Sequence, residues 1–245
     1  MEGVETAVTA FFNGEKFLMP VYINFENKRF LTGDLGVMTG EMGTHGFFTF
    51  DKLKLFKNTL KKIEDDLKKD GYVGTIDVNC IINEDGIWPL EFTSRFGYPL
   101  ISLIFEGLRG HTRVTDLLVG LVNKTLDFVE ADDGYQIGIA VCVPTFPYMD
   151  GFERYGKETP VMIMKDDVMV HFHPGDLKLD NNMWITAGSV GWGFVVTGRG
   201  DTIFEAKTQA YENVKNIIVP NAIYRIDISD RWLKDYPKLH RWGYI

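Results

Sequence analysis

The chain has 245 residues, of which 45% are apolar, 13% aromatic and 24% charged. This composition is typical of a packed globular protein and excludes disordered and low-complexity classes. The 34 acidic residues outnumber the 26 basic ones, and the net charge of -8 argues against a nucleic-acid partner. No apolar run approaches the roughly 18 residues of a membrane span, so we expect no membrane partner.

The cysteines and the N-terminal segment indicate the compartment. Cys80 and Cys142 are too few for a disulfide framework or a zinc cluster, which favours a reducing environment. The start, MEGVETAV, has neither the basic region nor the apolar core of a signal peptide. We therefore expect a cytoplasmic protein.

The first predicted elements are a hairpin and a loop. Strand-like residues 6–12 and 17–23 flank Asn13-Gly14, a dipeptide that strongly favours a hairpin turn. Residues 33–43 then contain four glycines, which predicts a loop in place of a helix or strand.

A helix and a second hairpin follow. Apolar residues at alternating steps of three and four predict the helix over residues 51–70. Strand-like residues 73–82 and 87–92 flank Asn83-Glu84-Asp85-Gly86, which predicts the hairpin. With a three-residue loop and a left-handed glycine at its end, Asn83 would face Ile87.

That turn would place four oxygen-bearing side chains on one face of the second hairpin. Asp77 would face Thr93 and Asn79 would face Glu91. Diagonal neighbours lie about 7–8 Å apart at the backbone, so the carboxylates of Asp77 and Glu91 can converge on Mg²⁺ or Mn²⁺. Arg95 follows where it can stabilise a phosphoryl oxygen. The alternative is a half-exposed sheet face with scattered polar groups, and a two-residue turn would separate the two carboxylates.

The second half of the chain alternates short strands with one strong helix signal. A helix is expected over residues 113–124, and the acidic stretch 127–134 is the best candidate for a linker. Asp201-Thr202 with Glu205 predicts a capping box on a helix that ends near Ile217. Short strands are expected at 138–143, 161–164, 168–172, 183–186 and 194–197.

Four segments carry a resemblance to ATP-grasp ligases. The metal-binding hairpin of that superfamily resembles GTIDVNCIINEDGIWPLEFTSRFGYP, and the loop of its phosphoribosylamine–glycine ligase family resembles ENKRFLTGDLGVMTGEMGT. The segment after that family's adenine hinge is similar to EGVETAVTAFFNG, and its C-terminal domain is similar to TAGSVGWGFVVTGRGDTIFEAKTQAY. The resemblance extends over nearly the whole chain in unbroken order.

The resemblance implies an α+β fold. The C-terminal lobe of an ATP-grasp domain, an antiparallel sheet with helices, would occupy residues 1–126. A small α/β C-terminal domain would occupy residues 136–245. An N-terminal domain, the nucleotide-covering lobe and the adenine hinge precede this region in the family. The chain is therefore expected to be the C-terminal half of a ligase that needs its N-terminal half in cis or in trans.

The resemblance also implies roles for residues in the first third of the chain. Glu5 matches the acidic residue that contacts the nucleotide ribose, and Lys28 matches the basic residue near the transferred phosphate. Asp34, Thr39 and Gly40 lie in the loop that contacts phosphate and the amine substrate. Val37-Met38 stands where the family has Pro-Asn.

The second hairpin matches the family's metal site. Asp77 and Glu91 match the metal ligands, with Thr93 in place of an asparagine, and Arg95 matches the arginine that steadies the acyl phosphate. Tyr98 replaces an aspartate of the family pattern. In the family, these positions lie near the acceptor pocket.

The function that the resemblance implies is an ATP-dependent carboxylate–amine ligase of purine biosynthesis. With ATP and Mg²⁺ or Mn²⁺, it would join glycine to phosphoribosylamine through an acyl phosphate. Two alternatives remain open: a related ATP-grasp ligase acting on another amine, and a non-catalytic module that binds a partner half.

Overall fold

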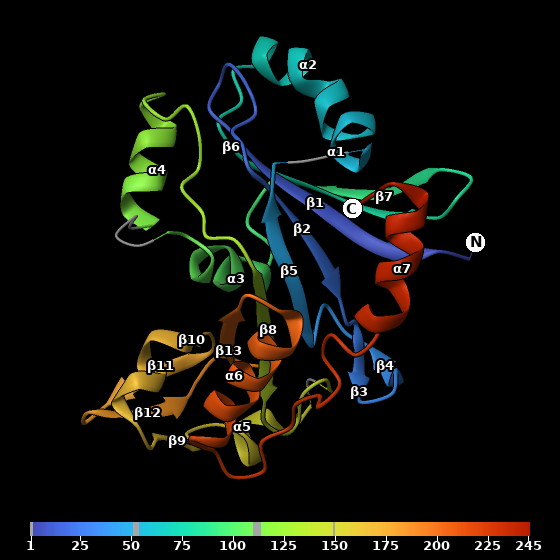
Figure 1. The fold of residues 1–245 in the computed structure, drawn as a ribbon. Helices are drawn as coiled ribbons and strands as arrows, with labels where there is room; N and C mark the ends of the chain where they lie inside the picture. Colours follow the sequence, from blue (N-terminus) through green and yellow to red (C-terminus); the bar gives the residue numbers. More distant parts are fainter. Residues whose placement is uncertain (1, 51–53, 110–113, 149) are drawn as a thin grey trace. The chain divides into compact units, whose positions relative to one another are not determined.

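The computed structural model describes residues 2–50, 54–109, 114–148 and 150–245 (Figure 1). Antiparallel strand pairs and helices confirm the expected α+β class. The chain forms two compact units that are discontinuous in sequence: Met1–Phe25, Gly46–Tyr135 and Asp230–Ile245 in the first, and Glu26–His45 and Gln136–Ser229 in the second. The contiguous family domains at 1–126 and 136–245 stay a prediction.

The first unit is built on strands in the order β5-β2-β1-β6-β7. These strands are β1 (Val4–Phe12), β2 (Val21–Glu26), β5 (Gly43–Thr49), β6 (Gly74–Ile82) and β7 (Ile87–Thr93). The helical segments are α1 (Lys54–Asn58), η1 (Leu60–Ile63), α2 (Glu64–Lys69), α3 (Leu100–Glu106), α4 (Val114–Val122) and α7 (Trp232–Trp242). The chain passes to the second unit within β2 and β5.

The first predicted hairpin is present, with a later second strand. Asn13 Oδ1 accepts hydrogen bonds from the amides of Glu15 (3.0 Å) and Lys16 (2.9 Å), which closes the loop as an Asx-turn. The returning strand begins at Val21, whereas the residues from 17 onward were expected to be extended; Phe17 forms only an isolated bridge.

The helix predicted over 51–70 is broken near its middle, and residues 51–53 lie outside the described residues. Thr59 adopts φ −125° and ψ −96°, and its hydroxyl donates to the carbonyl of Leu55 at 2.7 Å. Such bonding back to the preceding turn bends helices, which explains the division into α1, η1 and α2. The predicted apolar stripe is still used, since Leu55, Phe56 and Leu60 are buried.

Helices pack on both faces of this sheet, and on one face they cover only part of it. One face is packed by α1 and α7, where Phe17 lies edge-on to Phe56 (5.4 Å between ring centroids) and Phe25 to Trp232 (5.1 Å). The opposite face is packed by α3 and α4 around Phe11. Farther along this second face, polar side chains take the place of the apolar core.

The second unit contains smaller sheets and one long helix. A three-stranded group runs β10-β13-β8, a separate sheet runs β11-β12-β9-β14, and β3 pairs with β4. The strands are β3 (Arg29–Leu31), β4 (Leu35–Met38), β8 (Tyr135–Cys142), β9 (Pro160–Ile163), β10 (Phe172–Pro174), β11 (Leu177–Asp180), β12 (Met183–Thr186), β13 (Trp192–Gly200) and β14 (Ile217–Ile218). The helical segments are α5 (Phe152–Tyr155), η2 (Asp166–His171) and α6 (Ile203–Lys215).

Two expectations in this unit are wrong. The segment 33–43 is not only a loop, because Gly33 and Asp34 take left-handed φ angles (75° and 56°) that let β4 return beside β3. Residues 168–172 are not a strand; η2 occupies most of them and β10 begins at Phe172. The acidic pair Asp166-Asp167 in the first turn of η2 favours a helical start there.

The capping box is confirmed. Thr202 Oγ1 accepts from the amide of Glu205 at 3.2 Å, and Glu205 Oε2 accepts from the amide of Thr202 at 2.9 Å. Helix α6 then packs closely along β13, since a Cβ atom at Gly198 would overlap the backbone of Ala206 and Ala210 (Figure 1). None of the described helices is long and apolar enough to cross a membrane.

Replacing the cap tests the contribution of this helix start. Thr202→Ala removes the acceptor for the Glu205 amide, so we expect the free energy of unfolding to fall by about 0.5–2 kcal/mol. Thr208→Ala, on an exposed position of the same helix, is the matched control and should not lower stability, because alanine favours a helix more than threonine does. Equal losses in chemical denaturation would show that the capping box contributes nothing specific.

Candidate functional site

The pairing of β6 with β7 determines which polar side chains share a face. Asp77 lies opposite Thr93, and Asn79 lies opposite Glu91. Opposite residues in an antiparallel pair point to the same side, so all four side chains share one face of the sheet. The predicted register at these positions is therefore confirmed.

A β-bulge produces this register. Cys80 lies opposite Pro89 while Asn79 lies opposite Glu91, so Leu90 is an extra residue in β7. Bulges are frequent on edge strands, and β7 is at the edge of its sheet, where a proline without an N–H group is tolerated. The bulge shifts every later residue of β7 by one position.

The turn differs from the predicted one. Ile82, and not Asn83, lies opposite Ile87, so the loop spans residues 83–86. Asn83 Oδ1 accepts hydrogen bonds from the amides of Asp85 (2.8 Å) and Gly86 (3.3 Å), and Gly86 does not adopt the left-handed conformation that was expected. The longer loop and the bulge offset one another, which is why the expected pairs form.

The same polar face continues across the sheet. It carries Tyr22 and Asn24 from β2, Glu5 and Thr9 from β1, Asp77 and Asn79 from β6, and Glu91 and Thr93 from β7. Oxygen atoms therefore dominate a face that is apolar at its other end. Glu5 is paired with Ile81, and its carboxylate is half-buried.

Of the three carboxylates on this face, those of Asp77 and Glu91 share the β6–β7 hairpin but differ in environment. Asp77 is 6% exposed, and its Oδ2 accepts a hydrogen bond from the Thr9 hydroxyl at 2.7 Å. Glu91 is exposed. A fixed buried carboxylate beside a movable exposed one suits a hydrated cation, with the amide of Asn79 and the hydroxyl of Thr93 as further oxygen donors. Within the described ranges, no three His, Cys, Asp or Glu side chains gather as a metal-holding group.

Arg95 lies beyond the end of β7. Its side chain is exposed, and Nη1 donates to the carbonyl of the neighbouring Phe96 at 2.9 Å. No ion pair to a carboxylate forms at Arg95 among the residues that the structure describes. Most of its donors therefore remain available to an anion.

The remaining predicted site residues lie on or near the β3–β4 hairpin of the second unit. Lys28 Nζ forms an ion pair with Glu26 at 3.2 Å. The backbone amide and the hydroxyl of Thr39 both donate to the carbonyl of Lys28 (2.9 and 2.7 Å), which closes the base of the hairpin. Gly40 lies in an exposed segment where an added Cβ atom would meet nothing within 4 Å.

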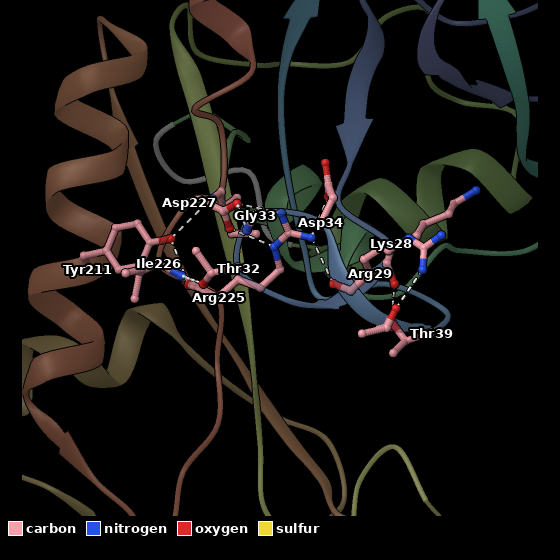
Figure 2. A network of polar contacts seen from close by, with 12 residues as sticks. Lys28, Arg29, Thr32, Gly33, Asp34, Thr39, Tyr211, Arg225, Ile226 and Asp227 are labelled. Carbon is pink, nitrogen blue, oxygen red and sulfur yellow. Dashed lines mark hydrogen bonds and ion pairs between the residues drawn. The ribbon is translucent and has the colours of Figure 1, made fainter.

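Asp34 is engaged by a residue far away in the sequence. Its Oδ1 accepts a hydrogen bond from Arg225 Nη1 at 2.9 Å, and its side chain is 42% exposed (Figure 2). Arg225 is 1% exposed, and its Nε and Nη2 also donate to the two carboxylate oxygens of Asp227 at 2.8 and 2.7 Å. None of the expectations from the sequence included this network. The one sequence feature that could have indicated it is an Arg and an Asp two residues apart among isoleucines (223, 226 and 228), because charged residues in an apolar stretch tend to pair.

The electrostatics of this network follow from burial and pairing. Burial alone would raise the pKa of Asp227, but the hydrogen bonds and charge of Arg225 and the amide of Gly33 outweigh it and hold the pKa below its ordinary value. Burial alone would lower the pKa of Arg225, and the bonds to both aspartates raise it instead.

The predicted site residues thus form two groups. The first unit holds Glu5, Asp77, Glu91, Thr93 and Arg95, and the second unit holds Lys28, Asp34, Thr39 and Gly40. Within the first group, β6 and β7 bring Asp77, Glu91 and Thr93 to one face. Within the second, the hairpin brings Lys28 and Thr39 together.

Comparisons with known proteins confirm the resemblance. Residues 1–100 match the family model described as phosphoribosylglycinamide synthetase, ATP-grasp (A) domain. The phosphoribosylamine–glycine ligase of Streptococcus pneumoniae is 28% identical over 243 residues, which cover 96% of this chain and 55% of that protein. The bifunctional purine biosynthetic protein PUR2,5 of Pichia angusta is 31% identical over 252 residues, which cover 97% of this chain and 30% of that protein.

A solved structure shows the same fold. The phosphoribosylamine–glycine ligase of Thermotoga maritima superposes with a TM-score of 0.70 at 21% identity, and the match covers 93% of this chain and 56% of that one. The chain therefore spans about half the length of these two ligases.

Acid should weaken the Arg225–Asp227 pair. Because the pKa of Asp227 is depressed in the folded state, its contribution to stability is fully present above the unfolded pKa of about 3.9 and is lost as pH falls through the folded pKa. We expect Asp227→Asn to destabilise the protein at neutral pH, with a difference from wild type that shrinks below about pH 4. Denaturation at several pH values measures this, and a difference that stays constant down to pH 3 would contradict it.

Proposed function

We propose that this chain is the C-terminal portion of an ATP-dependent carboxylate–amine ligase. It would supply the C-terminal lobe of an ATP-grasp domain, followed by a small α/β C-terminal domain. The match of residues 1–100 to an ATP-grasp (A) domain and the similarity to two phosphoribosylamine–glycine ligases support this proposal. The observation that carries it is the β6–β7 register, because it puts Asp77 and Glu91 on one face of the sheet.

The proposed reaction has two steps. The glycine carboxylate attacks the terminal phosphorus of ATP, which forms an acyl phosphate and releases ADP. The amine of phosphoribosylamine then attacks the acyl carbon, which releases phosphate and leaves glycinamide ribonucleotide. The similarity to the phosphoribosylamine–glycine ligase of Streptococcus pneumoniae supports phosphoribosylamine and glycine as the substrate pair.

Asp77 and Glu91 fit a divalent cation, with Thr93 as a weaker ligand. Hard carboxylate and hydroxyl oxygens suit Mg²⁺ or Mn²⁺, and both ions keep several waters and bridge to phosphates. Such an ion, when bound, neutralises charge on the phosphate oxygens. Thr9 supports the site by holding Asp77 Oδ2, so that the other oxygen of this carboxylate keeps a defined orientation.

Two cationic side chains are assigned to anionic oxygens. Arg95 can hold two oxygens of an acyl phosphate through its planar fork, and its position at the end of β7 follows the cation ligands directly. Lys28 would act at the transferred phosphate as a point charge, and its pairing with Glu26 limits its freedom in the absence of an anion. We assign Glu5 to the nucleotide ribose, and Asp34, Thr39 and Gly40 to the loop that meets phosphate and the amine.

A related ligase for another amine is the second candidate. Strand β4 exposes Leu35, Val37 and Met38, with Val37-Met38 where the family has Pro-Asn. An apolar edge on the loop assigned to the amine favours a less polar acceptor than a sugar phosphate.

Reconstitution tests the proposed function. The chain is mixed with the remaining N-terminal part of the Streptococcus pneumoniae ligase, and ADP release is followed with Mg²⁺-ATP, glycine and phosphoribosylamine. We expect release only when both protein parts and both substrates are present. Release with a different amine selects the second candidate. A stable complex that releases no ADP with any amino acid and amine tested would leave only a non-catalytic module and would overturn the proposal.

Neutralising the exposed carboxylate tests the cation site. Glu91→Gln keeps the size of the side chain and removes its charge, so turnover of the reconstituted ligase should fall by about 10²–10³-fold and should require more Mg²⁺. Glu84→Gln, in the exposed turn of the same hairpin, is the matched control and should retain activity. Equal activity of the two variants would remove Glu91 from the cation site.

A further inference from the structure

The β3–β4 hairpin has little apolar packing of its own. Phe30 is the one buried residue of the two strands. Leu31, Leu35, Val37 and Met38 are 41–63% exposed. Phe30 packs with Met42 and Cys142 in an apolar cluster, which secures β3. The exposed turn and β4 have no such packing and depend on other contacts.

Polar contacts from residues 225–227 fix the β3–β4 hairpin in place (Figure 2). Arg225 Nη1 donates both to Asp34 Oδ1 and to the carbonyl of Arg29, each at 2.9 Å, so one guanidinium nitrogen joins the first strand to the turn. Asp227 Oδ2 accepts from the amide of Gly33 at 2.8 Å, and the amide of Ile226 donates to the Thr32 hydroxyl at 3.2 Å.

The geometry of the guanidinium is essential to this arrangement. Nε and Nη2 hold Asp227 in a bidentate pair while Nη1 points to the hairpin, so one planar group bridges two segments. The ammonium of a lysine is a point charge on a flexible chain and cannot keep these directions together. Because Arg225 is 1% exposed, water cannot replace the lost bonds at low cost.

Helix α6 holds residues 225–228 in place through Tyr211. The hydroxyl of Tyr211 donates to the carbonyl of Arg225 at 3.0 Å and accepts from the amide of Ile228 at 3.1 Å. Helix α6 is itself packed closely on β13. A continuous set of contacts therefore runs from β13 through α6 and residues 225–228 to the tip of the hairpin.

We propose that Arg225 is a positioning residue of the ligase, with Tyr211 as its support. Together they fix the β3–β4 hairpin, which carries the loop assigned to phosphate and the amine. This inference rests on the proposed function, because that function gives the hairpin its substrates. Arg225 itself touches no substrate; its bonds set the place of Asp34 and of the backbone beside Lys28.

Amide hydrogen exchange tests whether Arg225 fixes the hairpin, and it requires no enzyme activity. In Arg225→Lys, and to a lesser degree in Tyr211→Phe, we expect the amides of residues 33–38 to exchange about tenfold faster or more. The amides of α6 and β13 should exchange as in wild type. Tyr224→Phe and Arg199→Lys are the matched controls and should leave the hairpin unchanged. Unchanged exchange in the hairpin, or an equal increase throughout the unit, would overturn the inference.

Kinetics of the reconstituted ligase test the consequence. A misplaced substrate loop should lower kcat/KM for the amine by about 10²-fold, mainly through a higher KM, while kcat, measured as ADP release with all substrates at saturation, changes less. A purely structural role would lower the melting temperature and leave both KM for the amine and kcat unchanged. Faster local exchange with normal kinetics would therefore overturn the inference. If wild type itself is inactive, the proposed function fails, and the exchange experiment still decides whether Arg225 holds the hairpin.

Discussion

One extra residue in an edge strand determines the chemistry available to this protein. Side chains on a β-strand alternate between faces, so a shift of one position moves a whole set of side chains to the other side. The bulge at Leu90 makes that shift within β7, and Glu91 consequently joins Asp77 on the polar face. Without the bulge, the four-residue turn would direct Glu91 away from Asp77. The proposed cation site, the place of Thr93 and the exit of the chain toward Arg95 all depend on this register.

The burial of Asp77 on the polar face explains why its carboxylate needs a hydrogen-bond partner. A buried carboxylate loses hydration and must recover it through hydrogen bonds or a positive charge. The Thr9 hydroxyl supplies one bond, and a divalent cation would supply the charge. The charge of Asp77 also affects the pKa of the neighbouring Cys80. Burial, and then the charge of Asp77, raise the pKa of Cys80 to about 12, which keeps this thiol protonated and unreactive.

The sequence predicted local features well where the signal was itself local. The capping box at Thr202, the hairpin at Asn13-Gly14 and the pairing of Asp77 with Thr93 are confirmed. The last of these was right for an incomplete reason, since a longer turn and a bulge cancel one another. The break at Thr59 was missed because the apolar periodicity continues through it.

Long-range contacts were beyond the sequence reasoning. Arg225 bonds to residues that precede it by 191 and 196 positions, and no spacing rule connects them. The hairpin at residues 29–38 was likewise hidden, because its glycines indicated a loop and its stabilising partners lie in another part of the chain. The roles of Lys28, Thr39 and Gly40 follow from the family resemblance and stay predictions.

The proposed cation site requires Asp77 and Glu91 to hold one divalent ion together. Paramagnetic broadening of amide resonances by Mn²⁺ in the presence of ATP is the sharpest test of this. We expect the amides of Asp77, Asn79, Glu91 and Thr93 to broaden first and those of Glu84 and Asp85 to persist, and we expect Asp77→Asn to abolish the effect. Broadening that begins at the acidic turn, or that spares Asp77 and Glu91, would contradict it.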